Sequence, residues 1–260
     1  MSFQSTNLRA WSQFAPWLSK QAVISREDVH YGLCIAGERE LSLLPQIANA
    51  RILDVGCGTG ENCHALAARG AEVVGIEPTK IFYETARASI PLHLNVCVLN
   101  RRWGSRSLVR FAPFDIVLFI GSSEFLRFDD LFFRTLSELT HQRSLILVAR
   151  VHPFWTTLFV HENARAKTQS YFNNGRIDHL LYEGCESSFA RCHHSIGYLT
   201  DQFGCNGWSL QKLVEPPVVP PDRAPFWVRG CYNDPALSRR MQLIPMTLIL
   251  TFTPRKAQSS

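Results

Sequence analysis

Three glycines at alternate positions follow directly on an apolar stretch, and this arrangement constrains the fold more than any other feature. Residues 52–55 form a β-rich run that leads into Gly56, Gly58 and Gly60, and residues 62–69 are compatible with a helix. Glycine has no Cβ, so it allows a sharp turn and the close approach of another molecule. The helix behind such a turn presents unpaired N–H groups and a partial positive charge. The pattern therefore predicts a strand, a ligand-binding turn and a helix, the first unit of a nucleotide-binding α/β fold.

A second strand with an acid at its end completes the predicted nucleoside site. Residues 72–76 are β-like and are followed by Glu77. A carboxylate at this position can accept two hydrogen bonds from a ribose diol. The glycines are spaced G-x-G-x-G, whereas dinucleotide-binding proteins show G-x-G-x-x-G, so the spacing argues against NAD. The turn and the acid together predict an adenosine site.

These two segments resemble the class I S-adenosylmethionine-dependent methyltransferases, and among them bacterial small-molecule methyltransferases. Leu53-Asp54-Val55-Gly56-Cys57-Gly58-Thr59-Gly60 is similar to the first motif of that family, and Val74-Gly75-Ile76-Glu77-Pro78 is similar to its second-strand acid. The resemblance is strong over residues 50–150 and weak over residues 190–255. It implies an α/β, Rossmann-like fold: a seven-stranded, mostly parallel sheet with an antiparallel last strand and helices on both faces.

The resemblance also implies S-adenosyl-L-methionine as cofactor and S-adenosyl-L-homocysteine as product. We expect a single domain over residues 1–260, with 1–50 as an N-terminal helical lid, 51–152 as the cofactor-binding core, and 153–192 and 216–245 as acceptor-side insertions. The residues expected to bind the cofactor are Asp54, Gly56, Cys57, Gly58, Gly60, Asn62, Glu77, Pro78, Asn100, Ser122 and Ser123. The family often has an acid where this chain has Asn100. Trp103 could stack on the adenine or belong to the core.

Candidate acceptor-side residues follow two later strands. The apolar run 113–120 predicts a buried central strand that ends shortly before Glu124, and residues 144–151 predict a strand that is followed directly by His152. Ligands of open α/β sheets bind at the carboxyl ends of strands. The family tends to show His-Arg-Thr where this chain has His193-His194-Ser195. His193 therefore matches the histidine of the family, whereas the contact that the family's arginine makes is not carried over to this chain.

The candidate bases are therefore His152, His193, His194 and Glu124, and histidine is the best matched to neutral pH. Each also has a structural alternative: a histidine can be a satisfied hydrogen-bonding residue, and Glu124 can cap the next helix. The resemblance implies that the chain moves a methyl group to an O or N atom of a small acceptor by in-line displacement. Abundant aromatic residues in the lid and insertions suggest that this acceptor is aromatic or natural-product-like.

Several expectations concern segments outside the core. Pro16 predicts short helices within residues 1–50, with further helices starting near 25–28 and spanning 38–47. Asn174-Gly175 predicts a hairpin turn in a β-rich insertion, and the proline-rich stretch 216–245 predicts a long ordered loop. A helix over 129–140 is expected to bury Leu131, Phe132, Leu136 and Leu139.

Composition limits the possible partners. The 260 residues are 46% hydrophobic, which supplies a full core, and the net charge of +5 is scattered apart from Arg101, Arg102, Arg106 and Arg110. That cluster is either a contact to an anionic partner or, as we favour, a solvated loop face. Eight cysteines without a C-x-x-C pair indicate reduced thiols in a cytoplasmic protein. Cys192-His193-His194 lacks a second pair at zinc spacing, so we expect no metal.

The expected partner is a small-molecule acceptor, bound by a monomer or a homodimer. No segment has the features of a signal peptide or the ~20 apolar residues needed to span a bilayer, so we expect no membrane partner. We do not expect a nucleic-acid partner either. Two alternatives remain open: an RNA methyltransferase that uses the arginine cluster, and a non-catalytic protein that binds S-adenosylmethionine. A steep salt dependence of RNA binding would favour the first.

Overall fold

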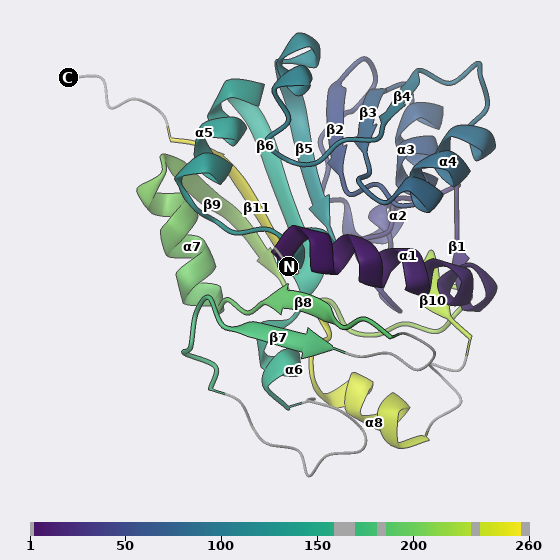
Figure 1. The fold of residues 1–260 in the computed structure, drawn as a ribbon, viewed down its shortest axis with the longest axis vertical. Coiled ribbons are helices and arrows are strands. Elements are labelled where there is room, and N and C mark those ends of the chain that lie inside the picture. Colours follow the sequence, from purple (N-terminus) through teal and green to yellow (C-terminus); the bar gives the residue numbers. More distant parts are fainter. Residues whose placement is uncertain (1–2, 159–169, 181–185, 230–234, 256–260) are drawn as a thin grey trace.

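A seven-stranded sheet forms the centre of the protein in the computed structural model, which describes residues 3–158, 170–180, 186–229 and 235–255 (Figure 1). The strand order is β4-β3-β2-β5-β6-β11-β9. The strands are β2 (Arg51–Val55), β3 (Glu72–Ile76), β4 (Val96–Leu99), β5 (Phe114–Ile120), β6 (Thr140–Val151), β9 (Trp208–Val214) and β11 (Thr247–Pro254). Strands β2 to β6 pair in parallel, whereas β11 runs antiparallel to both β6 and β9. The expected fold class is confirmed.

Helices cover both faces of this sheet. They are α1 (Phe3–Gln21), α2 (Glu38–Leu41), α3 (Glu61–Ala68), α4 (Lys80–Ser89), α5 (Asp130–Leu139), α6 (Pro153–Leu158), α7 (Ile196–Cys205) and α8 (Pro235–Leu243), with the 3-10 turns η1 (Arg106–Phe111) and η2 (Ser123–Phe125). Figure 1 shows α1, in dark purple, crossing the end of the sheet toward which β5 points.

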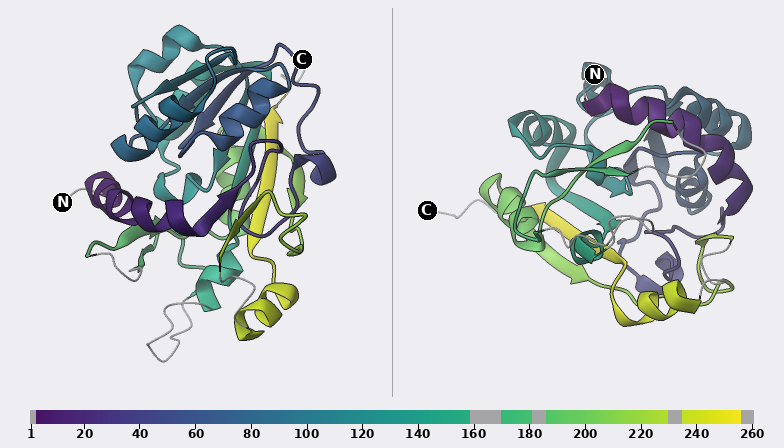
Figure 2. Two further views of the ribbon diagram at one scale, coloured as in Figure 1. Left: turned by 90° about the vertical axis from the view of Figure 1, so that its right-hand side faces the viewer. Right: turned by 60° about the horizontal axis from the view of Figure 1, so that its bottom comes forward.

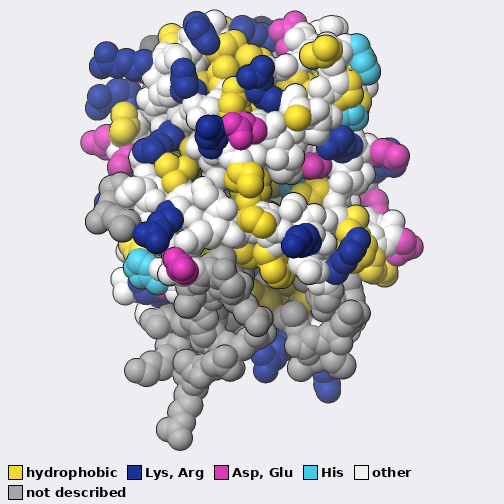
Figure 3. Space-filling view, turned by 45° about the vertical axis from the view of Figure 1, so that its right-hand side comes forward, with side chains coloured by type: hydrophobic (Ala, Val, Ile, Leu, Met, Phe, Trp, Pro, Cys, Tyr) yellow, Lys and Arg dark blue, Asp and Glu magenta, His cyan; other side chains and the backbone are white. Residues whose placement is uncertain are grey.

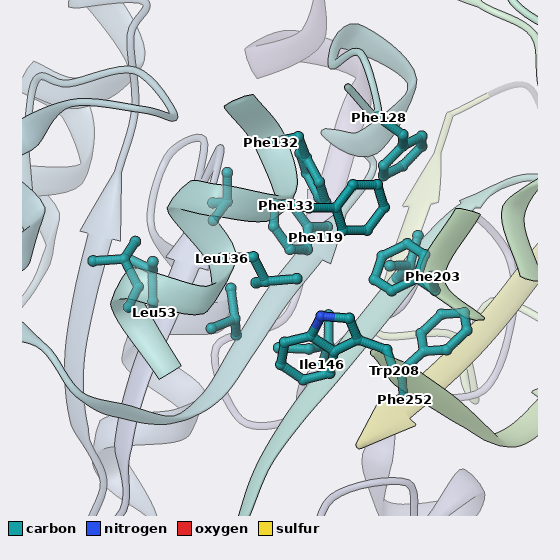
Figure 4. Packing of buried hydrophobic residues seen from close by; sticks show 14 of the residues in the cluster. Leu53, Phe119, Phe128, Phe132, Phe133, Leu136, Ile146, Phe203, Trp208 and Phe252 are labelled. Atoms are coloured by element: carbon teal, nitrogen blue, oxygen red, sulfur yellow. The ribbon is translucent and has the colours of Figure 1, made fainter. Parts of the chain in front are cut away.

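The central strands are buried on both sides, which explains their nearly continuous apolar sequence. In β5, Phe119 belongs to one core cluster and its neighbour Leu118 to the other, as the two-residue period of a strand requires. Figure 4 shows Phe132 of α5 and Phe203 of α7 in the first cluster. Leu66 of α3 packs in the second. Two cores therefore hold the sheet that positions the site.

The N-terminal segment forms one helix, so the expectation of short helices was wrong. Helix α1 continues through Pro16 over its 19 residues. Proline removes one backbone hydrogen bond and strains the preceding turn. Burial of Ala10 and Phe14 against Phe189 of the chain's later part offsets this loss. Tertiary packing overrides local propensity here.

Two small sheets flank the main one. Strand β1 (Ala22–Ile24) pairs with β10 (Phe226–Val228), and β7 (Ile177–Leu180) pairs with β8 (Phe189–Cys192), each pair antiparallel. The expected hairpin exists, but the Asn174-Gly175 pair precedes its first strand instead of forming its turn. The proline-rich stretch also holds more structure than a loop, because β10 and α8 lie within it. Figure 2 shows β7, β8 and α1 together beside the end of the main sheet.

Three further expectations were wrong in detail. The helix expected over 38–47 ends at Leu41, because the Glu38 carboxylate accepts hydrogen bonds from the backbone N–H groups of Leu43 and Leu44. Residues 25–28 form bends and no helix. Leu131 is 60% exposed, and Phe133 takes the expected place in the core. Among the described residues, no helix is long and apolar enough to cross a membrane.

Candidate functional site

The glycine turn connects β2 to α3 with all three of its glycines in the left-handed region. Their φ angles are +76° at Gly56, +58° at Gly58 and +88° at Gly60. A Cβ at Gly56 would lie 2.7 Å from Cβ of Ser122, so this glycine lets the turn after β5 approach closely. A Cβ at Gly58 would meet no atom within 4 Å, so open space lies beside the turn. The turn therefore has both the conformation and the free surface that a bound ligand needs.

Glu77 connects this turn to the end of β3. Its carboxylate accepts hydrogen bonds from the N–H of Gly58 at 3.1 Å and the N–H of Thr79 at 2.7 Å. Burial raises the pKa of Glu77, and these two backbone donors oppose that rise. Asn100 donates from Nδ2 to the carbonyls of Glu77 and Pro78 at 2.8 and 3.1 Å. With its nitrogen so placed, the Asn100 amide oxygen stays available as an acceptor.

A pocket of about 490 Å³ opens next to these groups, at the carboxyl ends of β3 and β4. It is lined by Pro78, Asn100, Arg101, Arg102, Trp103, Gly104 and Ser105. Trp103 lines this pocket and also packs against the core, 5.0 Å from Phe119 and 5.3 Å from Phe132 between ring centroids. The pocket, the turn and Glu77 form one continuous edge.

Asp54 and Asn62 lie beneath this edge. Asp54 is buried, and burial raises its pKa to about 7, while the Cys63 thiol donates to it at 3.5 Å. Cys57 is buried beside the same thiol. The amide of Asn62 exchanges two hydrogen bonds with the backbone of His30, at 3.0 and 3.1 Å. Asn62 therefore fastens the preceding segment to the start of α3.

The turn after β5 brings the next predicted residues to the same edge. The hydroxyls of Ser122 and Ser123 are buried without a hydrogen-bond partner in the described part of the chain. Glu124 is buried too; it accepts from the N–H of Val151 at 2.7 Å and lies 3.6 Å from Nη1 of Arg191. It joins the ends of β5 and β6 and contacts β8.

His152 and His193 are both held through both ring nitrogens. His152 Nδ1 accepts from the N–H of Phe154 at 3.1 Å, so its Nε2 carries the proton and donates to Glu215 at 2.7 Å. His193 donates from Nε2 to the carbonyl of Tyr171 at 2.9 Å and is 3.0 Å from the Thr156 hydroxyl through Nδ1. Burial lowers the pKa of each imidazole. Neither presents a free nitrogen.

His194 differs from these two histidines. Its Nδ1 is buried and has no hydrogen-bond partner among the residues that the structure describes. The ring stacks on Tyr198 at 5.0 Å and meets Phe128 edge-on at 5.3 Å. Burial, followed by the charge of Arg150, lowers the pKa of His194 to about 3. It is therefore a neutral ring with one unused nitrogen.

Two buried arginines of this region were missed by sequence reasoning. Arg150 lies near the end of β6 and Arg191 in β8, and they are 3% and 8% exposed. The available signal was Arg150 itself, because a charge that follows the apolar run 145–149 stands at the end of a buried strand. No group of three or more His, Cys, Asp or Glu side chains within the described ranges could hold a metal ion.

Helix α1 and β8 cover the acceptor-side residues. Trp11 of α1 packs edge-on against Phe189 of β8 and Phe125 of η2, with centroids 4.7 and 5.4 Å apart. The Asn7 side chain exchanges two hydrogen bonds with the backbone of Ala190, at 2.9 and 2.8 Å. We call α1 together with β7 and β8 the cap.

Comparison with known proteins places the glycine turn in a described family. Residues 52–142 match a family model described as a methyltransferase domain. A magnesium-protoporphyrin O-methyltransferase from Rhodobacter capsulatus is 30% identical over 152 residues, which are 58% of this chain and 66% of that protein. A ubiquinone biosynthesis O-methyltransferase from Bartonella bacilliformis is 26% identical over 127 residues, 47% of this chain and 50% of that protein. The matches thus span between half and about two thirds of these relatives.

Solved structures share the fold beyond the matched segment. A Listeria monocytogenes structure assigned to the S-adenosylmethionine-dependent methyltransferases superposes with a TM-score of 0.62 at 18% identity, covering 83% of this chain and 94% of that one. At this identity the likeness shows the fold alone. The matched domain holds the glycine turn and Glu77, in the order and topology of that fold. Residues 52–142 thus match a methyltransferase domain, and the chain has the fold of solved S-adenosylmethionine-dependent methyltransferases.

Proposed function

We propose that the protein transfers a methyl group from S-adenosylmethionine to an oxygen or nitrogen atom of a small aromatic or natural-product-like acceptor. The observation that carries this proposal is the continuous edge formed by the glycine turn, Glu77 and the pocket beside Asn100. Both curated relatives reported above are O-methyltransferases by name, which supports an oxygen acceptor over a nitrogen acceptor.

The residues along this edge fit an adenosyl group. The open space beside Gly58 allows a ribose to approach the backbone, and each oxygen of Glu77 can accept a further hydrogen bond from the ribose diol. The pocket lined by Asn100 and Trp103 offers an acceptor oxygen and an aromatic face for the adenine. Ser122 and Ser123, at the turn that packs on Gly56, have buried hydroxyls without partners among the described residues, which suits the methionine part.

The remaining residues of the expected cofactor site lie under the glycine turn, form part of it or follow Glu77. Asp54 lies buried beneath the turn, and Asn62 holds the first turn of α3 in place. Cys57 and Gly60 shape the turn itself, and Pro78 continues the chain beside the pocket.

Catalysis in this site is chiefly positioning. The sulfonium of bound S-adenosylmethionine supplies the electrophilic methyl group. The chain has to hold the acceptor atom ~3–3.5 Å from that methyl, opposite the sulfur, in a site without bulk water. We propose that Glu124, His152 and His193 build the wall of this site. Hydrogen bonds of the first two join the ends of β5, β6 and β9, and that of His193 joins the end of β8 to α6. Among the candidate bases, His194 has a buried Nδ1 without a hydrogen-bond partner in the described residues.

Glu77→Ala tests the cofactor site. Removing two charge-assisted bonds to the ribose should weaken binding of S-adenosylhomocysteine by roughly 1.5–3 kcal/mol, measured by isothermal titration. Glu72→Ala is the matched control, because Glu72 begins the same strand and is exposed. It should leave the affinity unchanged. Equal affinities of wild type and Glu77→Ala would contradict the assignment.

Methyl transfer itself is tested with labelled cofactor and a panel of small metabolites. A labelled small-molecule product supports the proposal, whereas a labelled RNA in the same assay would favour the alternative through the arginine cluster. All four arginines of that cluster are exposed. Figure 3 shows Lys and Arg side chains spread over one face, with acidic and apolar side chains between them. This distribution supports a small acceptor.

A further inference from the structure

Three charged side chains lie buried together behind the turn after β5, and their charges do not balance. Arg150, Arg191 and Glu124 are 3%, 8% and 4% exposed. Glu124 Oε2 is 3.6 Å from Nη1 of Arg191, and the charge of Glu124 also acts on Arg150. Two guanidinium groups therefore share one carboxylate. A buried charge is costly unless it is paired and hydrogen-bonded.

Three nitrogen atoms of the two guanidinium groups have no hydrogen-bond partner in the part of the chain that the structure describes. Arg150 donates from Nη2 to the carbonyl of Cys192 at 2.9 Å, but its Nε and Nη1 have no partner within the described ranges. Arg191 Nε also lacks one among these residues. Each guanidinium carries five N–H donors. Leaving a buried donor unsatisfied costs about 1–3 kcal/mol, so such groups in native proteins call for an explanation.

The neighbouring carboxylates do not supply the missing partner. Asp178 stands opposite Arg191 in the β7–β8 register, but both of its oxygens bind Arg176, at 2.7 and 3.1 Å. Glu124 already accepts from the N–H of Val151. Within the described part of the chain, the excess positive charge is therefore not neutralised by neighbouring carboxylates.

The pair lies where an acceptor would bind. Arg150 is near the carboxyl end of β6, and Glu124 follows the carboxyl end of β5 directly after Ser122 and Ser123. Open α/β sheets bind their ligands at this edge. Arg191 reaches the same place from β8, which passes over η2 as part of the cap (Figure 1). The covering strand and helix lie beside the end of the main sheet, over this edge (Figure 1).

We propose that Arg150 and Arg191 bind a carboxylate group of the methyl acceptor, which makes the acceptors of this protein carboxylic acids. The proposal rests on the methyl-transfer function proposed above. The planar fork of arginine matches the two oxygens of a carboxylate, and such pairs are strong when water is excluded. The bound anion would balance the buried charge and satisfy the unused donors. A carboxylic acid is already ionised at neutral pH, so no protein base has to remove its proton. This fits the site, because His152 and His193 offer no free nitrogen.

The test compares acids with neutral amides of the same shape. Benzoate and indole-3-acetate are titrated against wild-type protein saturated with S-adenosylhomocysteine, beside benzamide and indole-3-acetamide, with ligand-observed NMR as readout. The acids should bind at least tenfold more tightly than their amides. Arg191→Gln and Arg150→Gln should each reduce this preference to less than twofold, and Arg191→Lys should keep part of it.

Arg143→Gln is the matched control, because Arg143 lies in the same strand as Arg150 but is exposed at its other end. It should keep the full preference for acids. Thermal unfolding shows which variants are folded. If Arg150→Gln does not fold, Arg191→Gln and Arg191→Lys together still test the proposal. Equal binding of acids and amides to the wild type, or a preference that survives in Arg191→Gln, would overturn the proposal.

This outcome is separate from that of the proposed function. A protein that binds the acids through the arginines but does not bind S-adenosylhomocysteine retains the carboxylate site and loses the methyltransferase assignment. A protein that binds S-adenosylhomocysteine but treats acids and amides alike keeps the assignment and loses the carboxylate site.

Discussion

The cofactor edge and the acceptor side of this protein differ in how far the chain satisfies the charged groups that it buries there. Glu77 has a backbone donor on each of its oxygens, and Asn100 uses its nitrogen twice. Beside them, Arg150, Arg191 and His194 keep buried nitrogens without partners in the described part of the chain. Backbone donors hold the Glu77 carboxylate in the first region, whereas we propose that a bound carboxylate completes the second. On this proposal, we expect the chain to be preorganised for the cofactor and its selectivity for acceptors to depend on the cap.

The largest effect on this comparison is expected from replacing one glycine by alanine in each region. Gly56→Ala places a Cβ 2.7 Å from Ser122 at a φ of +76°, so left-handed strain adds to overpacking. We expect a loss of about 4 kcal/mol in the free energy of unfolding, together with loss of S-adenosylhomocysteine binding.

Gly175→Ala is the control in the insertion before β7. Its φ is +80°, but a Cβ there meets no atom within 4 Å, so only the strain of about 1 kcal/mol remains. Urea denaturation measures both variants. Similar losses in the two would show that the close approach of the β5 turn to Gly56 is unimportant.

The two ends of β6 offer a second comparison, with a smaller effect. His141 and His152 use the same pattern: Nδ1 accepts from the N–H two residues later, and Nε2 meets a carboxylate, at 3.0 and 2.7 Å. The side chain of His152 is 5% exposed, whereas that of His141 is 33% exposed. His152→Ala should therefore lower the free energy of unfolding by about 2 kcal/mol, because it removes a buried ring together with both of its hydrogen bonds.

Turnover separates the two ends further. His152→Ala should reduce kcat while leaving the affinity for S-adenosylhomocysteine within about threefold, or ~0.7 kcal/mol, because the wall of the acceptor site moves. His141→Ala should change neither. If His152→Ala reduced kcat and cofactor affinity equally, the residue would be structural for the whole sheet.

The pH dependence of stability gives the smallest expected effect. Burial lowers the pKa of His194 to about 3 from its usual 6.5, so the unfolded chain binds this proton at higher pH than the folded chain. The contribution is fully present above pH 6.5 and is lost as the pH falls toward 3. Between these values the slope is up to about 1.4 kcal/mol per pH unit.

Replacing this ring should flatten the curve. His194→Asn should remove that part of the acid-side slope, and His93→Asn, at an exposed position, should leave the slope as it is. Denaturant unfolding between pH 5 and 6.5 measures the difference. An unchanged slope in His194→Asn would mean that the ring does not titrate differently in the folded state.

The sequence alone predicts the cofactor edge well, because its signals are local. Glycines with φ above zero and a strand-end acid have few alternative uses, and the strand limits near Glu72 and Phe114 agree with the structure to within one residue. The alternating faces of β5 follow from the same short-range pattern.

The cap could not be predicted in this way, because its structure depends on contacts between distant segments. Pro16 stays helical because α1 packs on β8, and Asn7 reaches Ala190 across most of the chain. The partners of Arg191 come from η2, far away in sequence. Such contacts produce no periodic pattern in the sequence, so the unbalanced charge of Arg150, Arg191 and Glu124 is visible only in the three-dimensional structure.

The most direct test of the central claim is a crystal structure of the complex with S-adenosylhomocysteine. We predict that both ribose hydroxyls lie within hydrogen-bonding distance of the Glu77 carboxylate, with the adenine in the pocket beside Asn100 and Trp103. A nucleoside bound elsewhere, or one that leaves Glu77 without a ribose contact, would contradict the account.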